Sequence, residues 1–324
     1  MKTRHLGKSG PEISEIGFGA WAIGGNWGPQ GESDSISALE RALDLGVSFI
    51  DTAAGYGNGK SEKIIAQMLK GRDERVTVAT KTQPMPGDWP PSPYDKVEDR
   101  YAESYLREHI EERLRFLETD CLDLLQLHTW TRAWNSNPEP FAVLKELKKE
   151  GKIRLAGVST PEHDQNSVID LMRGGWVDVV QVIYNFFEQE PAAELLDVAQ
   201  ETGVGVIVGV PFDEGSLTGK FTEEFTFPEG DFRRDYFAGD RMPRTVKRVE
   251  AIKKELEDSG YTMAQAALKF ILAHPAVSTV IPGMRNAAQA EANAAVSDLS
   301  EMPEDLLGRL RAHAWRRAFW YDGK

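Results

Sequence analysis

The chain has 324 residues, with 38 Lys and Arg against 51 Asp and Glu, so its formal net charge is -13 at pH 7. Such an acidic surface argues against nucleic acid or an anionic membrane as a partner recognised through a broad basic face, and any anion site must be local. The single cysteine, Cys121, excludes an intramolecular disulfide and a cysteine-based metal site, and it fits a reducing compartment.

The amino-terminal segment MKTRHLGKSG has no apolar signal region, and no stretch approaches the roughly 20 apolar residues that a helix needs to cross a bilayer. We therefore expect a cytoplasmic protein without a membrane partner. The Gly-Lys-Ser-Gly-Pro turn within residues 1–17 predicts a β-hairpin before the first long element.

From residue 32 onward, short β-branched runs alternate with amphipathic segments of helical period, as is typical of βα units around a parallel sheet. Eight strands are predicted, at residues 16–20, 47–51, 75–81, 122–128, 153–159, 177–185, 204–210 and 278–283. Helices are predicted at residues 33–46, 60–70, 98–118, 140–151, 163–175, 191–203, 244–260, 262–275 and 286–296, and again toward the carboxyl end. This count favours a (β/α)8 TIM barrel of the α/β class over a doubly wound sheet, which normally uses fewer strands. We expect residues 1–324 to form a single domain.

Two connections are too long and too rich in Pro and Gly to be plain turns. They span residues 82–100 and 211–240, and both follow predicted strands. Because barrel enzymes work on the face where the strands end, we expect both to be functional loops.

The segment DTAAGYGNG, residues 51–59, allows two interpretations. A strand, glycines and then a helix is the layout of a dinucleotide-binding fingerprint, but that pattern requires a third glycine where Lys60 stands. The alternative is a sharp turn after a strand, made possible by the glycines, that holds Tyr56 in place. We favour the second interpretation.

Polar residues end several predicted strands, where a barrel gathers side chains at its mouth. Asp51 and Lys81 end neighbouring strands, and an ion pair between them could be purely structural. Tyr56 changes that balance, because a phenol with an ordinary pKa of about 10 can donate a proton near neutral pH when an adjacent ammonium stabilises its anion. His128, at the end of the next strand, would then orient a substrate oxygen. Together the four residues favour catalysis over coincidence.

These motifs resemble those of the aldo-keto reductases, and the resemblance runs in order through nearly the whole chain. The matching segments are GFGAW at residues 17–21, D-T-A-x-x-Y-G around Asp51 and Tyr56, A-T-K ending in Lys81, L-L-Q-L-H ending in His128, G-V-S ending in Ser159, Q-V-x-Y-N from Gln181 to Asn185, V-I-P-G at residues 280–283 and Q-x-x-x-N from Gln289 to Asn293. The resemblance implies a barrel that binds NADPH/NADP+ without a Rossmann domain and without a metal. Its implied activity is the reduction of aldehydes or ketones to alcohols by hydride transfer.

The resemblance also implies a role for each of the four polar residues. Tyr56 would be the general acid in reduction, and Lys81 with Asp51 would tune its acidity. His128 would position the carbonyl group of a small-molecule substrate.

The remaining implied roles concern the cofactor and the substrate pocket. Ser159 and Gln181 would hold the cofactor carboxamide, and Trp21 would line the pocket. The adenosine end would be held by Gly283, Met284, Arg285, Gln289 and Asn293. Trp130, two residues after His128, is a further pocket candidate. Since Arg285 opens the predicted last helix, where N–H groups and a guanidinium suit a phosphate, we expect NADP(H) rather than NAD(H).

Two positions depart from the family pattern. Many members have an aromatic residue at the end of the seventh strand that stacks on the nicotinamide, whereas this chain has Gly209, and Phe212 is a candidate replacement. The asparagine that often follows the strand-five serine is replaced by Thr160, whose hydroxyl cannot copy an amide.

Two other functions are compatible with the same fold. One is an NADPH-binding regulatory subunit, redox-sensing or channel-associated, with slow turnover. The other is a barrel lyase or isomerase that uses His128 and Lys81 without a nicotinamide. The presence of all four polar residues favours the reductase.

Overall fold

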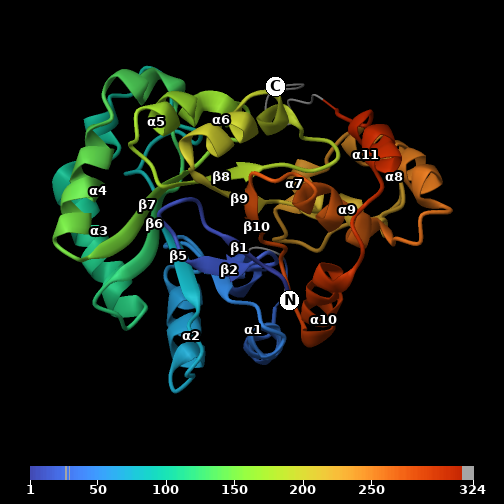
Figure 1. Ribbon diagram of the computed structural model, residues 1–324, viewed down its shortest axis with the longest axis horizontal. Coiled ribbons are helices and arrows are strands. Elements are labelled where there is room, and N and C mark those ends of the chain that lie inside the picture. Colours follow the sequence, from blue (N-terminus) through green and yellow to red (C-terminus); the bar gives the residue numbers. More distant parts are fainter. Residues whose placement is uncertain (26–27, 29, 316–324) are drawn as a thin grey trace.

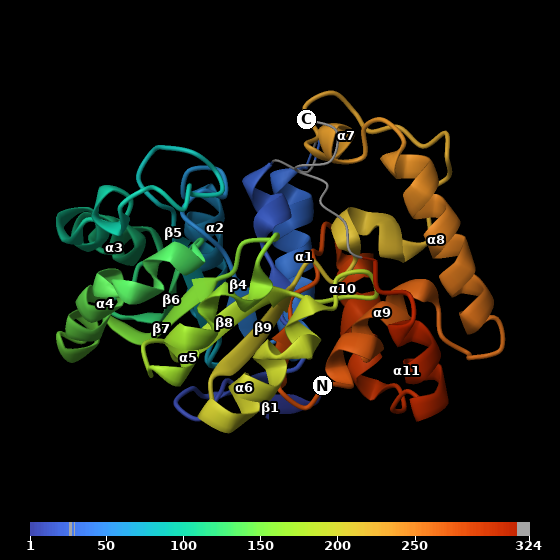
Figure 2. The same ribbon diagram turned by 90° about the horizontal axis from the view of Figure 1, so that it is seen from above.

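The computed structural model describes residues 1–25, 28 and 30–315. Its centre is a parallel sheet with helices packed around it (Figure 1 and Figure 2). The strands of this sheet are β3 (Phe18–Gly19), β4 (Phe49–Asp51), β5 (Thr77–Thr82), β6 (Leu122–Leu127), β7 (Ile153–Ser159), β8 (Val179–Ile183), β9 (Gly205–Gly209) and β10 (Val277–Val280). Each strand pairs with the next one along the chain, which is the order of a barrel.

The first and eighth strands close this sheet. Isolated parallel bridges join Ile16 to Val280 and Gly19 to Gly283. The backbones approach so closely here that a Cβ on Gly19 would lie 2.7 Å from the carbonyl oxygen of Ile281, so only glycine fits. The predicted (β/α)8 barrel of the α/β class is therefore confirmed.

Helices cover the outside of the barrel. They lie where the periodicity predicts them, with ends that differ by up to six residues, except for a short helix at residues 233–236 in the predicted loop 211–240. They are α1 (Glu32–Asp44), α2 (Lys60–Leu69), α3 (Glu103–Phe116), α4 (Glu139–Lys149), α5 (Ile169–Arg173), α6 (Leu195–Thr202), α7 (Arg233–Tyr236), α8 (Arg241–Leu256), α9 (Met263–Leu272), α10 (Ala287–Ala294) and α11 (Glu304–Arg311). Within residues 1–25, 28 and 30–315, no helix combines the length and the apolar character that crossing a membrane requires.

The helix predicted at residues 98–118 begins later than expected, at Glu103. The reason is the buried side chain of Arg100, which donates hydrogen bonds to the carbonyl oxygens of Met85 and Asp88, each at 3.0 Å, and also pairs with Asp95. These contacts hold the preceding residues in the long loop after β5. The second long loop is also partly ordered, since it contains a 3-10 helix, η6 (Asp213–Thr218), and α7.

The barrel interior is filled by one buried apolar cluster, and its floor is a hairpin of β1 (Thr3–His5) and β2 (Glu12–Ser14). The cluster consists of Leu6, Ile13, Phe49, Ala79, Leu124, Leu155, Val179, Ile207 and Ile281. Because helices cover the outer face as well, the strands are buried on both sides, and all six residues of β5 are inaccessible. The predicted amino-terminal hairpin is confirmed, and it seals the end of the barrel where the strands begin.

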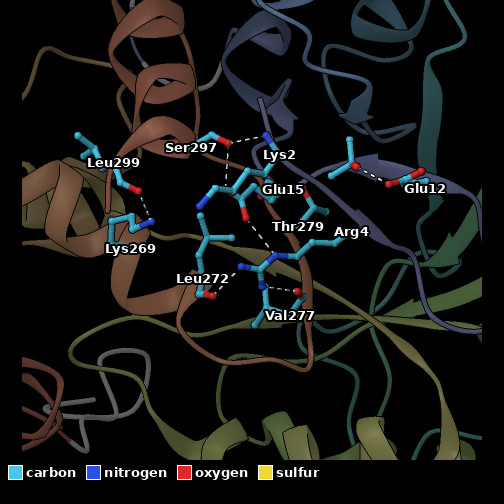
Figure 3. Close-up of polar contacts among 11 residues, drawn as sticks. Lys2, Arg4, Glu12, Glu15, Lys269, Leu272, Val277, Thr279, Ser297 and Leu299 are labelled. Atoms are coloured by element: carbon cyan, nitrogen blue, oxygen red, sulfur yellow. Dashed lines mark hydrogen bonds and ion pairs between the residues drawn. The ribbon is translucent and has the colours of Figure 1, made fainter. Parts of the chain in front are cut away.

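Polar contacts fasten this hairpin to the last third of the chain (Figure 3). The Arg4 guanidinium lies 3.1 Å from the Glu15 carboxylate and donates to the carbonyl oxygens of Leu272 and Val277. Glu15 in turn accepts a hydrogen bond from Ser297 at 2.9 Å. A cavity of about 740 Å³ lies at this end, and none of the predicted catalytic residues lines it. The floor of the barrel is therefore structurally separate from its mouth.

Candidate active site

A buried ion pair stands at the ends of two neighbouring strands. Asp51 ends β4 and Lys81 lies near the end of β5, and the Lys81 Nζ is 2.5 Å from the Asp51 Oδ2, with both side chains almost completely inaccessible. The same ammonium donates to the Thr52 carbonyl at 3.1 Å. Gln126, on β6, donates to the other Asp51 oxygen at 3.3 Å. Each charge of the pair thus has further partners, as a buried ion pair requires.

The charge of Lys81 is retained despite its burial. Burial alone would lower the pKa of its ammonium, but the negative charge of Asp51, together with the Tyr56 hydroxyl, outweighs burial and raises that pKa above the ordinary value of 10.5. The site therefore holds a permanent cation at neutral pH.

The Tyr56 hydroxyl lies 3.4 Å from the Lys81 ammonium. Burial raises the pKa of the phenol above its ordinary value of 10.0, and the positive charge of Lys81, which lowers it, does not reverse that rise. The direction differs from the sequence-based expectation, in which the ammonium sets the balance, because removal from water disfavours the phenolate more strongly. Tyr56 consequently keeps its proton at neutral pH and has it available to donate.

The glycines around Tyr56 turn the chain. Gly57 and Gly59 adopt φ values of 64° and 81°, in the left-handed region that favours glycine, and α2 begins at the next residue. Gly55 does not share this conformation. It is needed for space, because a Cβ there would lie 2.5 Å from the side-chain nitrogen of Gln83. The turn agrees with the predicted support for Tyr56.

His128 follows β6, and its backbone N–H donates to the Thr82 carbonyl at 2.9 Å. Its ring lies edge-on to that of Tyr56, with centroids 6.1 Å apart. Burial, assisted by the nearby Lys81 charge, lowers the pKa of His128 to about 3, so the imidazole is neutral. Its Nδ1 is buried and finds no hydrogen-bond partner in the described part of the chain. The ring as a whole is only partly buried.

Ser159 and Gln181 stand side by side, since Ser159, at the end of β7, is the register partner of Gln181, in the middle of β8. The Gln181 Oε1 is buried, and among the residues that the structure describes none bonds to it. Gly209 leaves space beside this amide. A Cβ at Gly209 would have the side-chain nitrogen of Gln181, at 3.5 Å, as its nearest neighbour. Phe212 packs against the core, as an ordinary core residue would.

Thr160 has a structural role in place of the amide found in the family pattern. Its hydroxyl bonds to the Gln165 side chain at 2.5 Å and to the Gln181 carbonyl at 3.2 Å, and the residue is buried. It therefore fixes the connection between β7 and β8.

The residues predicted for the adenosine end lie in the loop after β10 and on α10, to which Gln289 and Asn293 belong. The Arg285 amide donates to the Gln289 side chain at 2.8 Å, and Asn286 caps α10 by accepting from the Gln289 amide. A Cβ on Gly283 would have no atom within 4 Å, so space remains there. The other two predicted residues, Met284 and Asn293, are buried, and Met284 can offer a ligand only its backbone.

The structure separates the two predicted pocket tryptophans. Trp21 stacks on Tyr56, with ring centroids 6.1 Å apart, and also contacts Phe232 at 5.0 Å. Trp130 is completely buried, and its indole N–H donates to Asn135, so it is a core residue rather than a lining one. Trp89, from the long loop after β5, lies edge-on to His128 instead, at 5.7 Å.

Two residues near the site escaped the sequence analysis. Phe232 lies in the loop predicted to be functional, so its aromatic side chain was a usable signal. Gln30 binds both the guanidinium and the carbonyl of Arg285, each at 2.8 Å, and nothing in the sequence around it indicates this.

Comparisons with known proteins agree with this arrangement. The model of the aldo/keto reductase family matches residues 15–314. The aldo-keto reductase YhdN of Bacillus subtilis is 34% identical over 313 residues, which cover 94% of this chain and 91% of the relative. The NADH-specific methylglyoxal reductase of Escherichia coli is 29% identical over 334 residues, covering 98% of this chain and 100% of the relative.

A solved structure extends the likeness to three dimensions. The glycerol dehydrogenase of Gluconobacter oxydans has a TM-score of 0.79 and 25% identity, covering 96% of this chain and 94% of that one. The chain therefore belongs to the aldo/keto reductase family, whose members generally reduce carbonyl compounds with NAD(P)H.

Proposed function

We propose that the protein is an NADP(H)-dependent oxidoreductase that reduces aldehydes or ketones to alcohols, with Tyr56 as the general acid. The observation that carries the proposal is the position of the Lys81 ammonium, 2.5 Å from Asp51 and 3.4 Å from the Tyr56 hydroxyl. The Asp51 carboxylate holds the Lys81 ammonium beside the Tyr56 phenol. The phenol carries the proton, and the ammonium stabilises the phenolate that remains after the proton is released.

The chain's own residues act on the substrate oxygen. A bound nicotinamide cofactor would supply a hydride to the carbonyl carbon, which places negative charge on that oxygen. Tyr56 would donate its proton to the oxygen, and Lys81 would stabilise the phenolate that remains. His128, neutral, would donate a hydrogen bond to the same oxygen. Because these donors are fixed before the reaction, they stabilise the developing charge without reorganisation.

The residues at the mouth fit such a cofactor. The buried Gln181 Oε1 requires a donor, which a carboxamide N–H would provide, and Ser159 stands next to it. We assign the adenosine end to Gly283, Met284, Arg285, Gln289 and Asn293. Arg285 is the reason to prefer NADP(H), since a guanidinium suits an additional phosphate. In this proposal residues 1–324 act as one domain.

The test compares cofactor binding with turnover. NADPH and NADH are titrated by protein fluorescence, and cofactor consumption is followed over a panel of aldehydes, ketones and sugars for the wild type and Tyr56→Phe. Tyr94→Phe is the matched control, because it removes the same hydroxyl from a tyrosine that is 94% exposed. We expect Tyr56→Phe to lose about 10²- to 10⁴-fold in kcat.

Two outcomes contradict the proposal. If neither cofactor binds, the protein is not a nicotinamide-dependent enzyme. If Tyr56→Phe reduces carbonyl compounds as fast as the wild type and the Tyr94→Phe control, Tyr56 is not the acid.

A further inference from the structure

The loop after β9 contains an unusual concentration of backbone strain. Val210, Asp213 and Glu214 adopt φ values of 48°, 47° and 54°, a region that residues other than glycine rarely occupy and that is especially unfavourable for a β-branched side chain. Strained residues of this kind persist only where the surrounding structure holds them, and they cluster at binding sites. The loop is therefore held in one particular conformation at the barrel mouth.

This conformation buries the carboxyl group of Glu214. The residue is only 9% exposed, its Oε2 is inaccessible to solvent, and that oxygen has no hydrogen-bond partner within residues 1–25, 28 and 30–315. A buried carboxylate without a partner is costly in free energy, and such a group tends to take up a proton instead.

The charged groups around Glu214 reinforce this tendency. Burial raises the pKa of Glu214 to about 8, and the carboxylates of Glu162 and Asp231 add to the rise, whereas Arg233 opposes it. Arg233 also pairs with Asp231, since its guanidinium lies 2.6 Å from that carboxylate. The remaining ionisable neighbour on α7, Tyr236, has a pKa raised well above 10.0, so it stays neutral. Glu214 is thus a mostly neutral acid at pH 7 that ionises in mildly alkaline solution.

Glu214 also lies close enough to the proposed site to affect it. A negative charge on Glu214 contributes to the raised pKa of Tyr56, on the other side of the mouth. Asp231, beside Glu214, is in electrostatic contact with Arg285 in the loop after β10. In TIM barrels the loops after the seventh and eighth strands commonly form the phosphate-binding region. The loop that carries Glu214 therefore belongs to the mouth, where its Phe232 also contacts Trp21 with ring centroids 5.0 Å apart.

We propose that cofactor binding to this protein is linked to protonation of Glu214, so that the cofactor binds the neutral carboxyl form and an ionised Glu214 must take up a proton first. This inference rests on the proposed function. Its physical basis is repulsion, because nicotinamide dinucleotides carry at least two negatively charged phosphates, and a carboxylate in a poorly solvated site repels them strongly. Glu214 is a positioning and regulatory group in this scheme and takes no part in the chemical step.

The test measures affinity rather than turnover. Dissociation constants of NADPH and NADH are determined by fluorescence at several pH values for the wild type and for Glu214→Gln, which is permanently neutral and of the same size. Between pH 7 and pH 9.5 we expect the wild-type affinity to fall by about tenfold or more, the factor that corresponds to a one-unit difference in pKa between free and bound protein. Calorimetry at pH 8 in buffers of different ionisation enthalpy should show proton uptake by the wild type on binding.

The variant makes the test decisive. Glu214→Gln should bind equally well at both pH values, and more tightly than the wild type at pH 9.5, which a damaged protein would not do. A control, Glu162→Gln, should keep the decline but move it to lower pH, because the Glu162 charge helps to raise the pKa of Glu214.

Three results would overturn the inference. A wild-type affinity that does not change with pH would show that Glu214 is not linked to binding. A decline that persists in Glu214→Gln would assign the titration to another group. If neither cofactor binds at any pH, the proposed function itself fails and this inference fails with it.

Discussion

The ammonium of Lys81 lies 2.5 Å from the carboxylate of Asp51, and both side chains are excluded from solvent. Two charges in this situation depend on each other, because removal of either leaves the other buried and unpaired. Lys81 also links Asp51 to the Tyr56 hydroxyl, because its ammonium contacts both. Its removal should therefore affect both folding and the proposed chemistry.

We expect Lys81→Met to lower the free energy of unfolding by about 3–5 kcal/mol and kcat by about 10²- to 10⁴-fold. The double variant Lys81→Met with Asp51→Asn should regain much of the stability and none of the rate. Lys269→Met is the control, because Lys269 is also a buried lysine but lies at the floor of the barrel. Urea unfolding and steady-state kinetics check these values. A Lys81→Met enzyme with wild-type kcat would contradict the proposed role.

The pH dependence of stability should carry a contribution from His128. Its pKa is about 3 in the folded protein against an ordinary value of 6.5, so between these values the unfolded chain binds more protons than the folded one. Stability contributed by neutral His128 is therefore present above about pH 6.5 and is lost as the pH falls toward 3. His128→Gln should weaken this decline, as measured by urea unfolding at pH 7.5 and pH 5. An unchanged pH dependence would show that folding does not lower the pKa of His128.

A second buried ion pair supports the site from outside the barrel. Glu62, on α2, lies 3.0 Å from the Arg113 guanidinium on α3 and accepts a hydrogen bond from Thr80 on β5 at 2.6 Å. Burial raises the pKa of Glu62 to about 7, and Arg113 limits the rise. A raised folded pKa means that stability is lost as the pH increases from about 4.5. Arg113 thus matters most in neutral and alkaline solution.

Arg113→Met should lower the free energy of unfolding by about 3–5 kcal/mol at pH 8 and by less at pH 5, where Glu62 is mostly protonated in the folded protein and leaves no unpaired buried charge. Adding Glu62→Gln should remove this difference between the two pH values. Chemical unfolding at each pH measures both effects. A loss that is equal at pH 5 and pH 8 would mean that Arg113 acts through packing.

The choice of cofactor should depend on Arg285. We expect Arg285→Met to weaken NADPH binding by about 10- to 100-fold, the range for a hydrogen bond to a charged group, and to change NADH binding much less. Gln30→Ala is the control, since it removes a partner of the guanidinium without removing its charge. Fluorescence titration of both cofactors measures the effect. Equal losses for NADPH and NADH would show that Arg285 does not recognise the additional phosphate.

The sequence predicts the positions of the strands, which follow from the hydrophobic periodicity, and the polar residues at the strand ends. β7 matches its predicted range, residues 153–159, because its apolar run is bounded by a Gly-Lys turn and by the Ser159 strand end. The predicted strand at 177–185 is too long, since Asn185 leaves the sheet to accept hydrogen bonds from the amides of Phe187 and Glu188. A hydrophobic pattern does not predict hydrogen bonds of this kind between a side chain and the backbone.

Residues contributed by long loops are the part of the candidate site that pattern could not place. Trp130 and Trp89 are both aromatic residues in strand-following loops, yet one is in the core and the other lies on His128. Glu214 reads as an ordinary exposed loop acid in the sequence, and only its backbone conformation buries it. Which way such a side chain turns is decided by tertiary packing rather than by local composition.

The hydrogen bonds of Arg4 have a consequence for the order in which the protein is made. The carbonyl groups that it binds, on Leu272 and Val277, lie 268 and 273 residues further along the chain. During synthesis the hairpin therefore lacks these two hydrogen bonds, and the barrel around its buried Leu6 and Ile13 stays open, until the final strand has emerged. Contacts of such long sequence separation slow folding and prolong the exposure of apolar surface. Completion of the barrel and burial of its first residues thus depend on the same late segment.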